Sequence, residues 1–139
     1  MASLARSPSL ARSRNMRAIR SYGNRSTEVR LRAGLVRQGV RGWRVQSGAF
    51  GAPDFLFCRE RIAIFADGCF WHGCPRCGHI PKTNAQYWRQ KIAKNRQRDL
   101  LVSRTLKRTG YTVIRMWECQ VRSDLAGCVR RIRMIVEAR

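Results

Sequence analysis

At 139 residues the chain is long enough for one domain with its own hydrophobic core, without help from disulfide bonds. Its 29 lysines and arginines against 8 acidic residues give a formal net charge of +21, which destabilises a compact chain by self-repulsion unless an anionic partner relieves it. The basic residues run along the whole chain and not along one amphipathic face, which disfavours a membrane surface and favours nucleic acid as that partner.

Residues 1–24 predict a flexible basic arm, because they are rich in serine and arginine and contain no acidic residue. A transit peptide has a similar composition, so this alternative stays open. A globular domain is expected over residues 25–139. Neither a signal peptide nor a transmembrane segment is recognised, so a cytoplasmic location is expected.

The first element of the domain is a helix predicted over residues 26–39, with Ser26 as N-cap and Gly39 as its stop. Leu31 and Leu35 give this helix an apolar stripe. Residues 43–46 predict a short strand. The apolar runs 54–57 and 61–66, joined by the turn 58–60, predict a buried β-hairpin.

A long helix is predicted over residues 85–110, followed by a strand over 111–118 and a closing amphipathic helix over 123–138. Helical spacing places six residues of the long helix on one inward face: Trp88, Ile92, Asn95, Asp99, Val102 and Leu106. The inward face of the closing helix is Leu125, Val129, Ile132 and Val136. The order of elements predicts a single-domain α/β fold with a mixed central sheet flanked by helices.

Four cysteines have the spacing of a structural zinc site: Cys69, Cys74, Cys77 and, just after the later strand, Cys119. His79 is an alternative to Cys77 as a ligand, and four buried free thiols are the alternative to a metal. Without a signal peptide, closely spaced cysteines favour metal over disulfides. Cys58 and Cys128 are interpreted as small apolar residues inside a strand and a helix.

Four polar residues are the catalytic candidates in so basic a chain. Asp54 opens a strand beside a loop, a common position for a carboxylate that binds Mg²⁺ near a phosphate. His72 is the best-placed base, and Asp99 and Glu28 can reach the same place from their helices. Each has a simpler alternative: a turn cap for Asp54, a zinc ligand for His72, an arginine partner for Asp99 and a helix N-terminus for Glu28.

Six stretches in this order resemble the very short patch repair (Vsr) endonuclease family: RSRNMRAIRS, TEVRL, PDF, DGCFWHGC, YWRQKIAKNRQRD and GYTVIRMWEC. They span about residues 12–122. The resemblance implies a restriction-endonuclease-like fold with a structural zinc, and Mg²⁺-dependent nicking of one DNA strand next to a T:G mismatch. Such mismatches arise when 5-methylcytosine deaminates.

Position by position, the resemblance implies that Asp54 binds the catalytic metal and that His72 activates the attacking water. It implies that Asp99 supports His72, and that Glu28 belongs to the same site. Ala66 stands where well-known members have threonine, a change without effect if the Mg²⁺ ligand is the backbone carbonyl. Asp67 stands where some members have histidine, which adds charge near the metal.

The resemblance also implies DNA contacts. Phe70, Trp71 and Trp88 match aromatic residues that wedge into the base stack beside the mismatch, where stacking is already weakened. A core position for Phe70 and Trp71 is the alternative, although two adjacent aromatics are hard to bury together. Met16 matches a residue that approaches the minor groove. The long helix presents Lys91, Lys94 and Asn95 to DNA, with a solvated face as the alternative.

The implied partner is double-stranded DNA with a T:G mismatch, bound by a monomer in the bacterial cytoplasm at the nucleoid. Mismatch-repair proteins and a cognate cytosine methyltransferase are further partners, and no membrane is involved. Two other functions stay open from the sequence. One is a restriction or homing-type endonuclease of the same fold that cuts paired DNA, and the other is a non-catalytic zinc-containing DNA-binding module.

Overall fold

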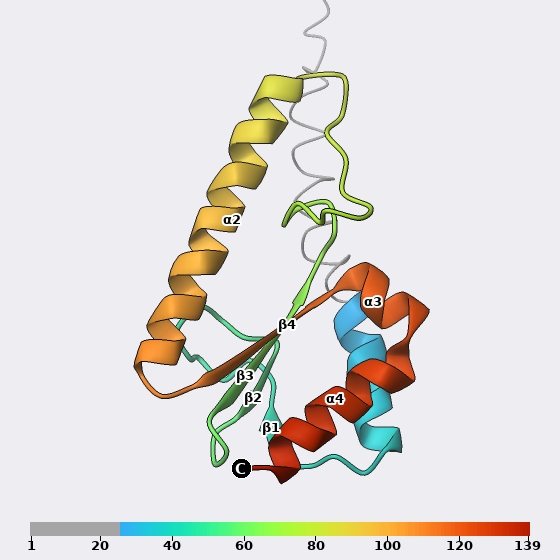
Figure 1. Ribbon diagram of the computed structural model, residues 1–139, viewed down its shortest axis with the longest axis vertical. Coiled ribbons are helices and arrows are strands. Elements are labelled where there is room, and N and C mark those ends of the chain that lie inside the picture. Colours follow the sequence, from blue (N-terminus) through green and yellow to red (C-terminus); the bar gives the residue numbers. More distant parts are fainter. Residues whose placement is uncertain (1–25) are drawn as a thin grey trace, which may run out of the picture.

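A four-stranded mixed sheet with helices on both faces forms the centre of the computed structural model, which describes residues 26–139 (Figure 1). The strands are β1 (Trp43–Arg44), β2 (Phe55–Phe57), β3 (Ile62–Asp67) and β4 (Thr112–Trp117), in this spatial order. β1, β2 and β3 pair antiparallel, while β3 and β4 pair parallel. The predicted α/β class, mixed sheet and 54–66 hairpin are therefore confirmed. The predicted basic arm, with Met16, lies outside the described residues.

One face of the sheet is covered by three helices: residues 26–37, α3 (Glu118–Ser123) and α4 (Leu125–Glu137). They bury the larger of two hydrophobic clusters, formed by Leu31, Leu35, Val40, Phe55, Phe57, Ile62, Ile64, Ile114, Met116, Val121, Val129 and Ile132. The alternating residues of β2 and β3 point to the opposite face. Alternate residues of the hairpin therefore belong to two different hydrophobic clusters, one on each face of the sheet.

The other face is covered by α2 (Ala85–Arg108), which packs on a smaller cluster of Leu56, Ala63, Phe65, Val102 and Leu106. The predicted inward stripe of α2 is confirmed, because Ile92, Val102 and Leu106 are buried and Asp99 is half-buried. The first half of α2 continues past the sheet, beside the loop that returns from β3 (Figure 1). None of the described helices is both long and apolar enough to cross a bilayer.

Local backbone geometry explains where the prediction fails. Ser26 is already helical, so it is not the N-cap, whereas Gly39 ends the helix as predicted with a φ of 69°. β1 is two residues long, and the left-handed φ of 49° at Gln46 breaks the predicted strand 43–46. α3 was not predicted, since six residues are too few for a helical period to show.

Cys58 is exposed in the turn after β2, so the interpretation of a packed strand residue is wrong. Cys128 is half-buried in α4 and packs on the larger cluster, as predicted.

The loop between β1 and β2 is pressed directly against α2 at Gly51. A Cβ atom at this position would lie 2.2 Å from Cγ1 of Val102, and Gly51 has a φ of 79°. Both the close approach and the left-handed backbone require glycine. This contact fixes the loop that leads into Asp54.

We predict that Gly51→Ala lowers the free energy of unfolding by about 2–5 kcal/mol, the sum of left-handed strain and overpacking. Gly48→Ala is the matched control, because Gly48 has a φ of 73° but open space around its Cα. Urea unfolding measures both variants. Equal losses would show that the contact with Val102 contributes nothing.

Candidate active site

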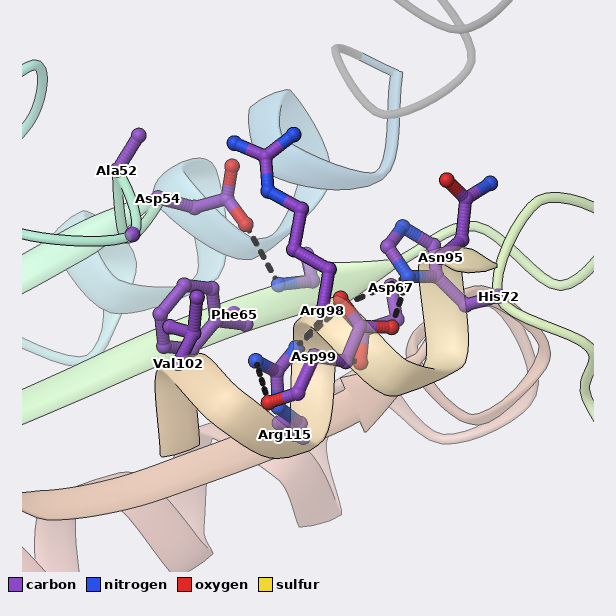
Figure 2. A pocket seen from close by; sticks show the side chains of 12 residues that line it. Ala52, Asp54, Phe65, Asp67, His72, Asn95, Arg98, Asp99, Val102 and Arg115 are labelled. Carbon is purple, nitrogen blue, oxygen red and sulfur yellow. Dashed lines mark hydrogen bonds and ion pairs between the residues drawn. The ribbon is translucent and has the colours of Figure 1, made fainter. Parts of the chain in front are cut away.

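The catalytic candidates meet in a pocket of about 190 Å³ at the start of β2, where β3 runs on beneath α2 (Figure 2). Its lining comes from the loop before β2, from β3, from the loop after β3, from α2 and from β4. The residues are Gly51, Ala52, Asp54, Phe65, Ala66, Asp67, His72, Asn95, Arg98, Asp99, Val102 and Arg115. Asp54, His72 and Asp99 are thus brought together from three segments distant in sequence.

Asp54 directly precedes β2 and is held there by hydrogen bonds to β3. Its backbone N–H donates to the carbonyl of Ile64 at 2.9 Å, and its Oδ2 accepts from the N–H of Ala66 at 2.7 Å. The pKa of Asp54 is raised to about 7, mainly by burial; the hydrogen bond from Ala66 opposes the rise, and the negative charges of Glu28 and Asp67 add to it. Glu28 does not line the pocket, but its carboxylate acts on Asp54 electrostatically.

The environment of Asp54 fits a hard divalent cation. The N–H and C=O of one strand residue face the same neighbouring strand, so the Ala66 carbonyl faces the edge where Asp54 lies. β2 pairs with β3 only as far as Ile64, so this carbonyl is beyond the ladder. Asp54 and the Ala66 carbonyl would supply the oxygen ligands that Mg²⁺ prefers. A bound cation would also offset the cost of ionising a buried carboxyl.

His72 is paired with Asp99 across the pocket. Its Nδ1 lies 2.5 Å from Oδ2 of Asp99 and 3.9 Å from Oδ1 of Asp67. Burial lowers the pKa of His72, but the hydrogen bond to Asp99 and the two carboxylates outweigh burial, so the pKa is raised. Because Nδ1 is engaged, Nε2 is the ring nitrogen that remains to accept a proton. The alternative of a zinc ligand for His72 is not supported by this geometry.

Two residues of the site escaped the sequence prediction of catalytic residues. Asp67 is 5% exposed at the end of β3, and Arg115 projects from β4. Nη1 of Arg115 lies 3.1 and 3.2 Å from the two carboxylate oxygens of Asp67. Burial raises the pKa of Asp67, and His72 and Arg115 oppose that rise. The sequence offered one signal for both residues: each is a charged residue in an otherwise apolar strand, with Asp67 at the end of β3 and Arg115 in the middle of β4.

Phe70, Trp71 and Trp88 form an aromatic cluster beside the pocket. The ring centroids of Phe70 lie 5.2 Å from those of Trp71 and 5.5 Å from those of Trp88, all in edge-on packing. Trp71 is 6% exposed, whereas Phe70 and Trp88 are half-buried. The core alternative therefore holds for Trp71, which packs between Phe70 and the first half of α2, whereas Phe70 keeps part of its ring exposed.

Asn95 connects this cluster to α2. Its Nδ2 donates to the carbonyl of Trp71 at 3.0 Å, so it holds the chain directly before His72. Lys91 and Lys94 lie on the same half of α2, with Lys94 exposed. Met16, the remaining predicted DNA contact, lies outside the described residues.

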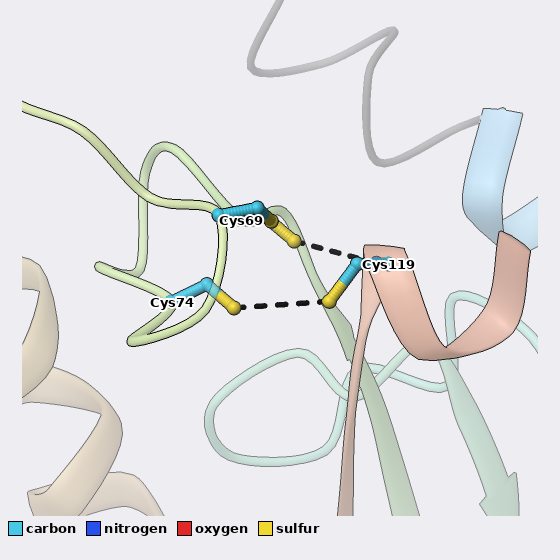
Figure 3. A group of neighbouring side chains, drawn as sticks. Cys69, Cys74 and Cys119 are labelled. Atoms are coloured by element: carbon cyan, nitrogen blue, oxygen red, sulfur yellow. Dashed lines mark hydrogen bonds between the residues drawn. The ribbon is translucent and has the colours of Figure 1, made fainter. Parts of the chain in front are cut away.

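The four predicted zinc ligands converge on one point. The Sγ atoms of Cys69, Cys74, Cys77 and Cys119 lie within 4.8 Å of one another. Figure 3 shows three of these side chains, and the Sγ atoms of Cys74 and Cys119 are 3.8 Å apart. A tetrahedron with Zn–S bonds of about 2.3 Å has edges of roughly 3.8 Å. The cluster therefore fits zinc, and His79 is not part of it. His79 instead packs beside Phe70, with ring centroids 5.8 Å apart.

Backbone hydrogen bonds prepare this cluster for a metal. Burial raises the pKa of the Cys74 thiol, but the N–H groups of Cys77 and Arg76, together with the thiols of Cys119 and Cys77, outweigh burial and lower the pKa to about 7. The N–H of Cys119 donates to Sγ of Cys69 at 3.3 Å. The cluster joins the loop after β3 to the start of α3. Since Phe70, Trp71 and His72 lie between two of its ligands, it fixes their backbone.

Comparison with known proteins gives consistent matches. The family described as DNA mismatch endonuclease Vsr matches residues 8–77. The Type II nicking enzyme V.NaeI of Lentzea aerocolonigenes is 39% identical over 123 residues, covering 85% of this chain and 74% of that protein. The DNA mismatch endonuclease Vsr of Escherichia coli is 40% identical over 114 residues, covering 80% and 71%. The Type II nicking enzyme V.NmeAIP of Neisseria meningitidis is 37% identical over 111 residues, covering 78% of each.

We predict that the purified protein holds one zinc ion per chain and that Cys119→Ser loses it, because three thiolates bind zinc more weakly than four. Cys58→Ser is the control, since Cys58 is exposed and outside the cluster. Metal analysis after dialysis against a weak chelator measures the zinc content. Zinc retained by Cys119→Ser, or lost equally by Cys58→Ser, would contradict the assignment.

We predict that Asp54→Asn stabilises the protein at alkaline pH without added divalent cations. The folded pKa of about 7 exceeds the ordinary 3.8, so the native state binds the extra proton and loses stability as pH rises between these values. The advantage of the asparagine variant grows over that range and levels off above about 7. Thermal unfolding at several pH values measures this difference in stability between Asp54→Asn and wild type. Glu137→Gln is the control, because it removes one negative charge in the same way at an exposed position. An advantage independent of pH would contradict the argument.

Proposed function

The chain belongs to the DNA mismatch endonuclease Vsr family, and we propose that it nicks one strand of duplex DNA beside a T:G mismatch, with Mg²⁺ as cofactor. Membership makes the chain a nicking DNA endonuclease with a restriction-endonuclease-like fold. The T:G substrate and the identity of the metal are the proposal. The observation that carries it is the convergence of Asp54 and the His72–Asp99 pair on one pocket.

The pair supports activation of a water molecule by His72. Asp99 accepts a hydrogen bond from the N–H at Nδ1, which fixes the neutral tautomer and stabilises the imidazolium that forms later. Nε2 then takes a proton from water while the water oxygen bonds to phosphorus, and the bond from phosphorus to the leaving sugar oxygen breaks. Mg²⁺ held by Asp54 and the Ala66 carbonyl would supply charge stabilisation of the phosphate oxygens.

The aromatic cluster supports recognition through weakened stacking. Phe70 and Trp88 keep accessible ring surface, and Phe70 is two residues before His72. Inserting a ring costs a few kcal/mol of unstacking, and a mismatched step lowers that cost. We propose that Phe70 and Trp88 lead the insertion, while the buried Trp71 supports them from behind. Opening the base step beside His72 would bring the neighbouring phosphate into the pocket.

The charge of the chain supports DNA as the substrate. Lys91, Lys94 and Asn95 lie on the half of α2 that extends past the sheet. We propose that they contact the sugar-phosphate backbone of the DNA beside the mismatch. Zinc at the cysteine cluster has a structural role in this proposal. The partners that follow from it are a cognate cytosine methyltransferase and mismatch-repair proteins, and the proposed state is a monomer at the nucleoid.

We predict Mg²⁺-dependent nicking of a labelled duplex with a T:G mismatch, and no nicking of the same duplex with T:A. The mismatch is placed in a pool of flanking sequences, and the products are sequenced. His72→Ala is expected to lower the single-turnover rate by about 10²–10⁴-fold through loss of the general base. His79→Ala is the matched control and keeps that rate, because its ring lies outside the pocket.

Equal cleavage of T:G and T:A duplexes would replace the repair function with a restriction-like one. Salt-sensitive binding without cleavage of any duplex, at any concentration of Mg²⁺, would favour a non-catalytic module.

We predict that Phe70→Leu reduces the ratio of T:G to T:A nicking rates, because a smaller side chain fills an opened base step poorly. Phe50→Leu is the matched control, since Phe50 is exposed but belongs to no ring cluster among the described residues. Single-turnover rates on both duplexes measure the ratio. An unchanged ratio in Phe70→Leu would assign the cluster to packing alone.

A further inference from the structure

Arg115 is a charged residue in the middle of the otherwise apolar strand β4. The parallel register places it opposite Phe65 of β3, and the guanidinium lies over the Phe65 ring at 4.2 Å from the ring centroid. This stacking fixes the plane of the guanidinium beneath the pocket. An aliphatic side chain would satisfy the strand pattern at lower desolvation cost, so packing alone does not explain arginine here.

The guanidinium donates in three directions from its fixed plane. Nη1 reaches both oxygens of Asp67 on β3 at 3.1 and 3.2 Å. Nη2 donates to the backbone carbonyl of Asp99 at 3.1 Å, and Nε donates to Oγ of Ser103 at 2.8 Å. The last two contacts grip one turn of α2 at the residue that holds His72. Arg115 therefore connects β4, β3 and α2 at the catalytic pair.

The same guanidinium neutralises both carboxylates that face His72. Nη1 lies 3.7 Å from Oδ1 of Asp99 as well as 3.1 Å from Oδ1 of Asp67. The atoms of Asp67, His72 and Asp99 that could bind a metal lie within 4.8 Å of one another, close enough to share a cation. Arg115 already places a fixed positive charge beside them. This disfavours a divalent cation at these three residues and leaves Asp54 as the carboxylate for Mg²⁺.

We propose that Arg115, together with Asp67, is a positioning residue that fixes Asp99 and thereby orients His72 for catalysis. The inference rests on the proposed function, because the rate of nicking is one of its readouts. Arg115 touches neither His72 nor the reacting atoms. Its effect passes through the carboxylate of Asp67 and the helical turn that carries Asp99.

The test separates positioning from charge neutralisation with three variants. Arg115→Lys keeps the charge but cannot donate to Asp67, Asp99 and Ser103 together. Arg115→Met leaves Asp67 buried without its cation, and Arg115→Met with Asp67→Asn removes that uncompensated charge. Arg133→Met is the matched control on the exposed face of α4, where Arg133 pairs with Glu137. Each variant is measured for thermal stability, for DNA affinity and for the single-turnover rate on a T:G duplex.

We expect the double variant to recover the stability that Arg115→Met loses, while its nicking rate stays about 100-fold below wild type at unchanged DNA affinity. The nicking rate of Arg115→Lys is expected to fall between the rates of the double variant and of wild type. Return of the double variant to the wild-type rate would overturn the proposal and reduce Arg115 to a counter-ion for Asp67.

A second readout does not depend on cleavage. The low-field proton NMR signal of the Nδ1–H bond from His72 to Asp99 is assigned by its loss in His72→Ala, since the chain has only two histidines. We expect this signal to weaken or disappear in the double variant and to persist in Arg133→Met. Its persistence in the double variant would overturn the proposal. If wild type nicks no duplex at all, the proposed function fails, and the signal still decides the role of Arg115.

Discussion

The parallel register between β3 and β4 is the constraint on which the rest of the structure depends. It pairs Phe65 with Arg115 and Asp67 with Trp117, so both strands end at the same edge of the sheet. Cys69 and Cys119 follow two residues after that last pair and meet in the cysteine cluster. One register therefore forms the acidic side of the pocket and the cysteine cluster, and α2 closes the pocket by packing on the same strands.

Buried acids are costly in a protein, and each acid of this pocket has a different compensation. Asp67 is compensated by the guanidinium of Arg115, and Asp99 by His72 together with the same arginine. Among residues 26–139, Asp54 accepts a hydrogen bond from the N–H of Ala66 but forms no ion pair, and its pKa is raised to about 7. Of the three carboxylates it is therefore the one suited to an external cation. In the proposed function, this division of charge places the metal and the base on opposite sides of one pocket.

Periodicity and spacing predicted much of this architecture. The inward position of Asp99 followed from the helical spacing of Ile92 and Val102, and the cysteine cluster followed from the spacing of its members. The pairing partner of a strand does not follow from its own sequence, and so the contact between Asp67 and Arg115 was missed. Burial of Trp71 was also missed, because α2 covers it from a distant part of the chain. Residue type and position made Asp54 and His72 candidates, and the family resemblance supported their proposed roles, whereas their juxtaposition came from the fold.

The central claim is that the metal on Asp54 and the base His72 act on one phosphate from opposite sides of the pocket. The most direct measurement is a crystal structure of the protein with a T:G duplex and Mn²⁺, located by its anomalous scattering. The account predicts Mn²⁺ bound to Asp54 and the Ala66 carbonyl, with Nε2 of His72 facing the phosphorus. Mn²⁺ bound between Asp67 and Asp99, or a duplex lying away from the pocket, would contradict it.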